Sequence, residues 1–113
     1  MLNAFSVSLE ACDPTLGRFR SYRLDACPDL FGMWLVDIPY GRIGARGTSR
    51  RYVADDEAGA KKIIRHHLRR RTTAKQRIGV SYRACEVIDP DQWARLQKGD
   101  ELVSTTLNHK PGG

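Results

Sequence analysis

The segment from residue 55 to about residue 71 constrains the fold most, because it has a strong helical pattern. Acidic residues begin it and three arginines end it, and both placements suit a helix dipole. The carboxylate of Asp55 or Asp56 can cap the first turn. One face repeats at three- and four-residue steps, through Ala60, Ile63, Ile64, His67 and Leu68. We expect the basic side chains of the other face to be solvated, namely Lys61, Lys62, Arg65, Arg69 and Arg70.

Stretches on both sides of this helix alternate as β-strands do. Residues 5–9 and 18–24 flank a turn at residues 13–17 and predict a hairpin. Residues 33–36, residues 49–53 and a segment from 79 toward 88 are further strands, while Pro39 belongs at a strand end or bulge. A short helix is predicted at residues 92–97, followed by a frayed tail from Lys98. The fold class is therefore α+β, a small antiparallel sheet with one main helix packed on it and a short C-terminal helix.

The predicted core combines the apolar residues of these elements. It comprises Phe5, Leu9, Tyr22, Leu24, Trp34, Val36, Ile43, Val53, Ile63, Ile64 and Leu68. Trp93 is expected to be a further core anchor, and His66 is expected to be exposed.

Charge is unevenly distributed along the 113 residues, whose formal net charge is +6. Residues 41–83 contain thirteen Lys or Arg against three acids, a net charge of +10, whereas residues 1–40 have a net charge of −2. Such a basic block favours a polyanionic partner, nucleic acid first, with an acidic protein as the alternative. A solvated basic face is the simpler interpretation, and charge alone does not reject it.

Several classes of protein and site are not expected. No apolar run approaches the roughly 20 residues of a membrane helix, and the N-terminus does not resemble a secretory signal, so we expect a cytoplasmic protein without membrane contact. Cys12, Cys27 and Cys85 are widely spaced, which predicts free thiols and no metal or other cofactor. No residues stand at catalytic spacing, so we expect a binding module rather than an enzyme, as a monomer or weak dimer.

The segment from Tyr40 to Gly47 carries the most specific pattern, Tyr-Gly-Arg-Ile-Gly-x-x-Gly. An arginine among glycines can approach a phosphate closely and bind it with its planar fork. Tyr40 offers a surface on which a base could stack, and downstream arginines could extend the phosphate track. Two alternatives stay open: Arg42 could pair with Asp37, and Tyr40 could be an ordinary strand aromatic. The candidate nucleic-acid-binding residues are Tyr40, Gly41, Arg42, Arg46, Arg50 and Arg51.

This segment resembles the WGR domain family, named for a Trp-Gly-Arg triplet, over about residues 5–82. Later matching positions are Ala60, Lys75, Gly79 and Tyr82. Tyr40 replaces the family's tryptophan, which removes the indole N–H, and Gly79 and Tyr82 are further apart than in most members. The resemblance implies a small antiparallel sheet with the long helix packed on it.

The resemblance also implies a function. WGR domains accompany the catalytic domains of poly(ADP-ribose) polymerases, where the triplet lies near DNA ends, and they also occur as stand-alone bacterial proteins. For this chain the resemblance implies a WGR-like domain at residues 1–83, a C-terminal extension at 84–113, and binding to nucleic acid without transferase activity. DNA, including its ends or breaks, is the expected ligand.

Overall fold

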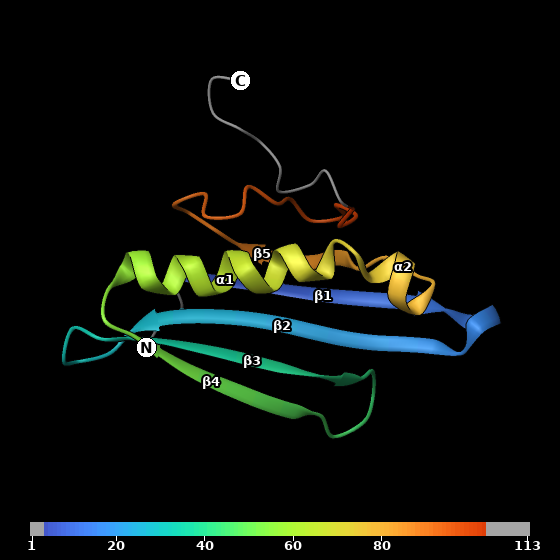
Figure 1. The fold of residues 1–113 in the computed structure, drawn as a ribbon, viewed down its shortest axis with the longest axis horizontal. Coiled ribbons are helices and arrows are strands. Elements are labelled where there is room, and N and C mark those ends of the chain that lie inside the picture. The colour runs from blue at the N-terminus through green and yellow to red at the C-terminus, as the bar shows by residue number, and fades with distance from the viewer. Residues whose placement is uncertain (1–3, 104–113) are drawn as a thin grey trace.

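The computed structural model describes residues 4–103 and contains a five-stranded antiparallel sheet. The strand order is β4-β3-β2-β1-β5, and helix α1 lies across one face of the sheet (Figure 1). The strands are β1 (Phe5–Asp13), β2 (Arg18–Pro28), β3 (Trp34–Arg42), β4 (Thr48–Ala54) and β5 (Arg83–Ile88). The helices are the 3-10 turn η1 (Pro14–Leu16), α1 (Glu57–Arg71) and α2 (Ala74–Ile78). The predicted α+β class is confirmed.

Helix α1 begins and ends close to the predicted positions. The Asp56 carboxylate caps it by accepting a hydrogen bond from the Gly59 N–H at 2.8 Å. Asp56 is one of the two residues predicted for this role. Its buried residues are Ala60, Ile64 and Leu68, which lie one turn apart on the predicted apolar face. The last turn carries three arginines, so the helix ends basic.

The predicted hairpin of β1 and β2 is also confirmed, with Leu9 opposite Tyr22 and Val7 opposite Leu24. These four side chains are buried on the face of the sheet that packs against α1, which we call the helix-side face. The opposite face is called the far face. In the β1–β2 turn, the Asp13 carboxylate accepts a hydrogen bond from the Thr15 N–H at 3.0 Å.

Two residues in and near β4 were predicted to belong to the core but are not buried. Val53 is 56% exposed, because strand alternation places it on the far face while Tyr52 packs toward α1. Ile43 is only partly buried, since it lies in the turn after β3. The remaining predicted core residues are buried or pack against the buried cluster, and residues such as Val7, Ile38 and Leu102 complete it.

Strand β3 is longer than the predicted apolar run and continues through Pro39 to Arg42. Contrary to the prediction, Pro39 therefore lies within a strand. It pairs with Ser49 of β4, whereas the register between β2 and β3 has pairs on both sides of Pro39 but not at it. A residue without an N–H is tolerated where the ladder is interrupted.

The predicted helix at residues 92–97 is wrong, and the short helix of the fold is α2 instead. Gln92 and Arg95 have positive φ angles of 54° and 57°, which no α-helix allows. The Asp89 carboxylate accepts hydrogen bonds from three successive N–H groups, those of Trp93, Ala94 and Arg95. These contacts hold the segment in turns.

The segment after β5 packs on the rest of the domain. Trp93 stacks on Phe5, with ring centroids 5.5 Å apart, and β5 itself pairs with β1. Leu102 is completely buried and its N–H donates to the Tyr82 carbonyl, so the chain is not frayed at this point, contrary to the prediction. The predicted tail beyond Val103 lies outside the described residues. Within residues 4–103, no helix is long and apolar enough to cross a membrane.

Candidate nucleic-acid interface

The turn between β3 and β4 explains two glycines of the Tyr-Gly-Arg-Ile-Gly-x-x-Gly segment. A Cβ atom on Gly41 would lie 2.9 Å from the Gly47 Cα, and a Cβ atom on Gly47 would collide with the Tyr40 carbonyl oxygen. The two backbones approach each other too closely for side chains. The absence of a side chain at Gly41 therefore makes room for the backbone of Gly47. The sequence had suggested that this room serves a phosphate instead. Gly44, with a φ of 81°, makes the turn between them.

The structure separates the six candidate residues into groups. The register of β3 and β4 places Tyr40, Arg42 and Arg50 on the helix-side face. Gly41 lies in β3 and pairs with Ser21 of β2, whereas the exposed Arg46 belongs to the turn. Arg51 lies on the far face, so the six do not form one continuous surface.

Arg51 has an acidic partner. Its Nε and Nη2 atoms donate to the two carboxylate oxygens of Asp37 at 2.7 and 3.2 Å. This pairing contradicts the alternative in which Arg42 pairs with Asp37. The guanidinium of Arg42 instead lies over the ring of Phe19, 5.7 Å from its centroid.

Arg42 faces a second arginine across the sheet. The β2–β3 register sets Arg20 directly opposite Arg42, and like charges in a cross-strand pair repel each other. The two line a hollow of about 200 Å³ together with Gly17, Arg18 and Phe19. We call Arg18, Phe19, Arg20, Arg42 and Arg46 the sheet-end surface. Among the described residues that line the hollow, none is acidic.

Sequence reasoning missed Arg18 and Arg20, because they belong to a segment whose net charge is negative. The signal that could have found them is the strand register, since β2 and β3 run antiparallel and bring residue 20 beside residue 42. Arg18 is also tied to α2, because its Nε donates to the Ile78 carbonyl at 3.2 Å.

The basic groups gather at one end of the molecule. Figure 1 shows the β1–β2 turn, the β3–β4 turn and α2 at the same end, which is also where α1 finishes with its arginines. The acidic start of α1, with Asp55, Asp56 and Glu57, lies at the other end. The fold thus concentrates positive charge beyond what the sequence segment alone carries.

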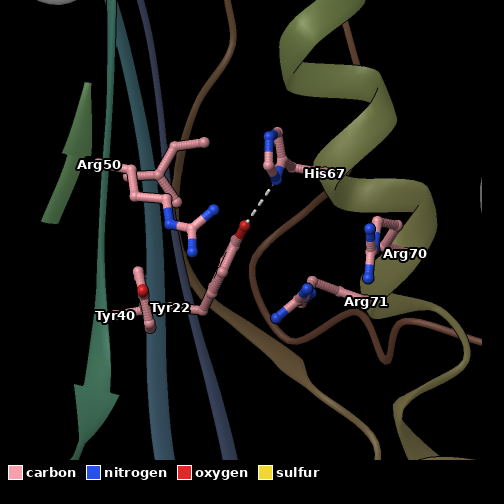
Figure 2. Close-up of a pocket in the computed structure, with 7 residues that line it drawn as sticks. Tyr22, Tyr40, Arg50, His67, Arg70 and Arg71 are labelled. Carbon is pink, nitrogen blue, oxygen red and sulfur yellow. Dashed lines mark hydrogen bonds between the residues drawn. The ribbon is translucent and has the colours of Figure 1, made fainter. Parts of the chain in front are cut away.

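Tyr40 is partly buried and packs against Tyr22, with ring centroids 6.2 Å apart. It also lines a cleft of about 230 Å³ between the sheet and the end of α1, whose other lining residues are Tyr22, Ile38, Arg50, His67, Arg70 and Arg71 (Figure 2). We call these seven residues the arginine cleft. Hydrogen bonds to the phenol oxygens of Tyr40 and Tyr52 raise the pKa of Arg50.

The outer face of α1 is solvated at most of the predicted positions. Lys61, Lys62 and Arg69 are exposed, as is His66. Arg65 differs, because its Nη1 donates to the Trp93 carbonyl at 2.7 Å and so joins α1 to the C-terminal segment. Arg70 is exposed but lines the arginine cleft.

Comparison with protein families identifies the fold. The model of the WGR domain matches residues 5–76, which is more than half of the chain. No curated protein and no solved structure matches the chain significantly. The matched range includes the four strands β1 to β4, helix α1 and the Tyr-Gly-Arg turn. The chain therefore belongs to the WGR domain family.

Proposed function

We propose that this protein binds DNA, at ends or breaks, through the sheet-end surface. WGR domains are in general nucleic-acid-binding modules. In this proposal the protein is a binding module without catalytic activity.

The observation that carries the proposal is the cross-strand pair of Arg20 and Arg42. Like charges placed directly opposite each other destabilise a sheet unless something offsets their repulsion. A phosphate between the two guanidinium groups would do so, because each planar fork can bind phosphate oxygens in a bidentate way. Arg18 lines the same hollow and adds a third positive charge.

Each residue has a distinct role in this proposal. Arg42 is the central phosphate contact, and the exposed Arg46 in the turn extends the track of phosphates. Tyr40, two residues before Arg42 on the same face, is the platform for an exposed base. Arg51 is excluded from the surface, because it lies on the far face and pairs with Asp37.

The test is fluorescence anisotropy of a labelled blunt duplex, titrated with the full chain at several salt concentrations. Arg42→Ala is compared with Arg51→Ala, since both remove one positive charge but only Arg42 belongs to the sheet-end surface. Arg42→Ala should weaken binding and reduce the slope of log K against log salt by about 0.9 for one lost phosphate contact. Arg51→Ala should leave both quantities close to those of the wild type.

A closed circular DNA competitor separates two modes of binding. Poor competition by the circle supports recognition of ends, whereas strong competition supports contacts to the backbone alone and overturns the end preference. Equal effects of the two substitutions would overturn the assignment of the surface. Absence of binding even at low salt would refute the proposal and favour an acidic protein as the partner.

A further inference from the structure

The arginine cleft brings together positive side chains from two separate elements. Arg50 comes from β4, while Arg70 and Arg71 come from the last turn of α1. In Figure 2 the Arg50 guanidinium points from the sheet side toward Tyr22 and His67, with the two α1 arginines on the other side. Within the described part of the chain, the residues that line the cleft include no carboxylate. Its three positive charges therefore have no counterion among these lining residues.

One hydrogen-bond donor of Arg71 has no acceptor at this site. Its guanidinium carbon lies 4.3 Å from the centroid of the Tyr22 ring, so the side chain is fixed by packing. Its Nε atom is shielded from solvent and has no hydrogen-bond partner. A buried polar group of an ionised side chain is costly to leave unpaired, so a rotation of the guanidinium that turns Nε–H toward an anion in the cleft would be favoured.

The remaining groups of the cleft do not supply negative charge. The Tyr22 hydroxyl and the His67 Nδ1 atom are hydrogen-bonded at 3.0 Å. Burial raises the pKa of Tyr22, which keeps its phenol protonated near neutral pH. Burial, together with the charges of His66, Arg71, Arg70 and Arg50, lowers the pKa of His67 and so disfavours the charged imidazolium. Neither group therefore carries a negative charge that could cancel the field of the arginines.

We propose that the arginine cleft binds a phosphate group, carried by a nucleotide or free as inorganic phosphate. Planar guanidinium forks match the oxygens of a phosphate, and three of them can share its charge. A volume of about 230 Å³ is below that of most pockets for larger ligands and suits a phosphate with a small attached group. The partly buried ring of Tyr40 forms a flat wall beside it.

This site does not depend on the proposed DNA binding, although Tyr40 has a role in both proposals. Its test therefore uses the α1 arginines, which are outside the sheet-end surface. Failure of the phosphate site would leave the comparison of Arg42→Ala with Arg51→Ala unaffected.

The experiment is an NMR titration of the full chain with inorganic phosphate, with AMP and with adenosine, each at matched ionic strength. The Nε–H resonance of Arg71 and the amide resonances of the cleft should shift with phosphate and with AMP, but not with adenosine. Arg70→Gln and Arg71→Gln should each weaken binding by about tenfold or more. Lys62→Gln removes one charge from the outer face of α1 and should leave the affinity unchanged.

The outcomes distinguish the source of the phosphate. Tighter binding of AMP than of inorganic phosphate supports a nucleotide, and equal binding supports phosphate itself. Thermal unfolding of each variant identifies one that has lost its fold, and Arg70 is exposed, so its substitution leaves the packing on Tyr22 in place. The proposal is overturned if phosphate leaves the Arg71 resonance unchanged, if adenosine binds as well as AMP, or if Lys62→Gln weakens binding as much as Arg70→Gln.

Discussion

Trp93→Ala tests whether the segment after β5 is part of the cooperative domain. Trp93 is 2% exposed and contacts two aromatic rings, Phe5 at 5.5 Å and Trp34 at 5.6 Å between centroids. Truncating a buried tryptophan to alanine typically costs about 3–5 kcal/mol, because it removes apolar burial and leaves a cavity. For a domain of this size, a loss of about 4 kcal/mol lowers Tm by roughly 20 °C.

The assay is urea unfolding followed by far-UV circular dichroism, which does not depend on the tryptophan that is removed. Leu30→Ala is the control, because Leu30 is 87% exposed and its truncation should change the unfolding free energy by no more than about 0.5 kcal/mol. A loss below about 1 kcal/mol for Trp93→Ala would refute the reasoning. It would mean that the strands and α1 form a stable core without this segment.

Three further predictions concern local features of the fold. Gly47→Ala should lower the unfolding free energy by about 1–3 kcal/mol in the same assay, because its Cβ would collide with the Tyr40 carbonyl oxygen. Asp56→Ala should cost about 1 kcal/mol by removing the α1 cap, and thermal unfolding should show a smaller effect for Asp55→Ala. Because the pKa of His67 is lowered on folding, its contribution to stability is present above the unfolded pKa near 6.5 and is lost as pH falls toward the folded value. Unfolding measured between about pH 5.5 and about pH 7.5 should show less of this loss in His67→Gln than in the wild type.

Local patterns were sufficient to predict α1, since its cap, its apolar spacing and its basic end all lie within one segment. The β1–β2 hairpin was predictable for the same reason, because its turn residues lie between two alternating runs. The same reasoning predicted a helix at residues 92–97, and that prediction is wrong. There the carboxylate of Asp89 accepts hydrogen bonds from the N–H groups of Trp93 and the next two residues. These bonds compete with the backbone hydrogen bonds of a helix, and the periodicity of the sequence does not reveal them.

The candidate site depended on contacts between distant residues, and these were only partly predictable. The sequence singled out Arg42, but its neighbour Arg20 comes from another strand and follows only from the register. Arg50 and Arg51 are adjacent in sequence yet lie on opposite faces of β4, so only one of them can share a surface with Arg42. The sequence predicted that side chains alternate between the two faces along β4. It did not predict which of these faces α1 covers.

Arginines on the two faces of the sheet differ in whether they have acidic partners. This difference argues against a merely solvated basic surface. On the far face, Arg23 pairs with Asp25 and Arg51 pairs with Asp37. The strand register instead sets Arg42 opposite another arginine, Arg20, and like charges in such a cross-strand pair repel each other. Solubility alone would be served equally well by ion-paired or widely spaced charges. Under the proposal that DNA binds the sheet-end surface, the bound anion would offset the repulsion between these two arginines.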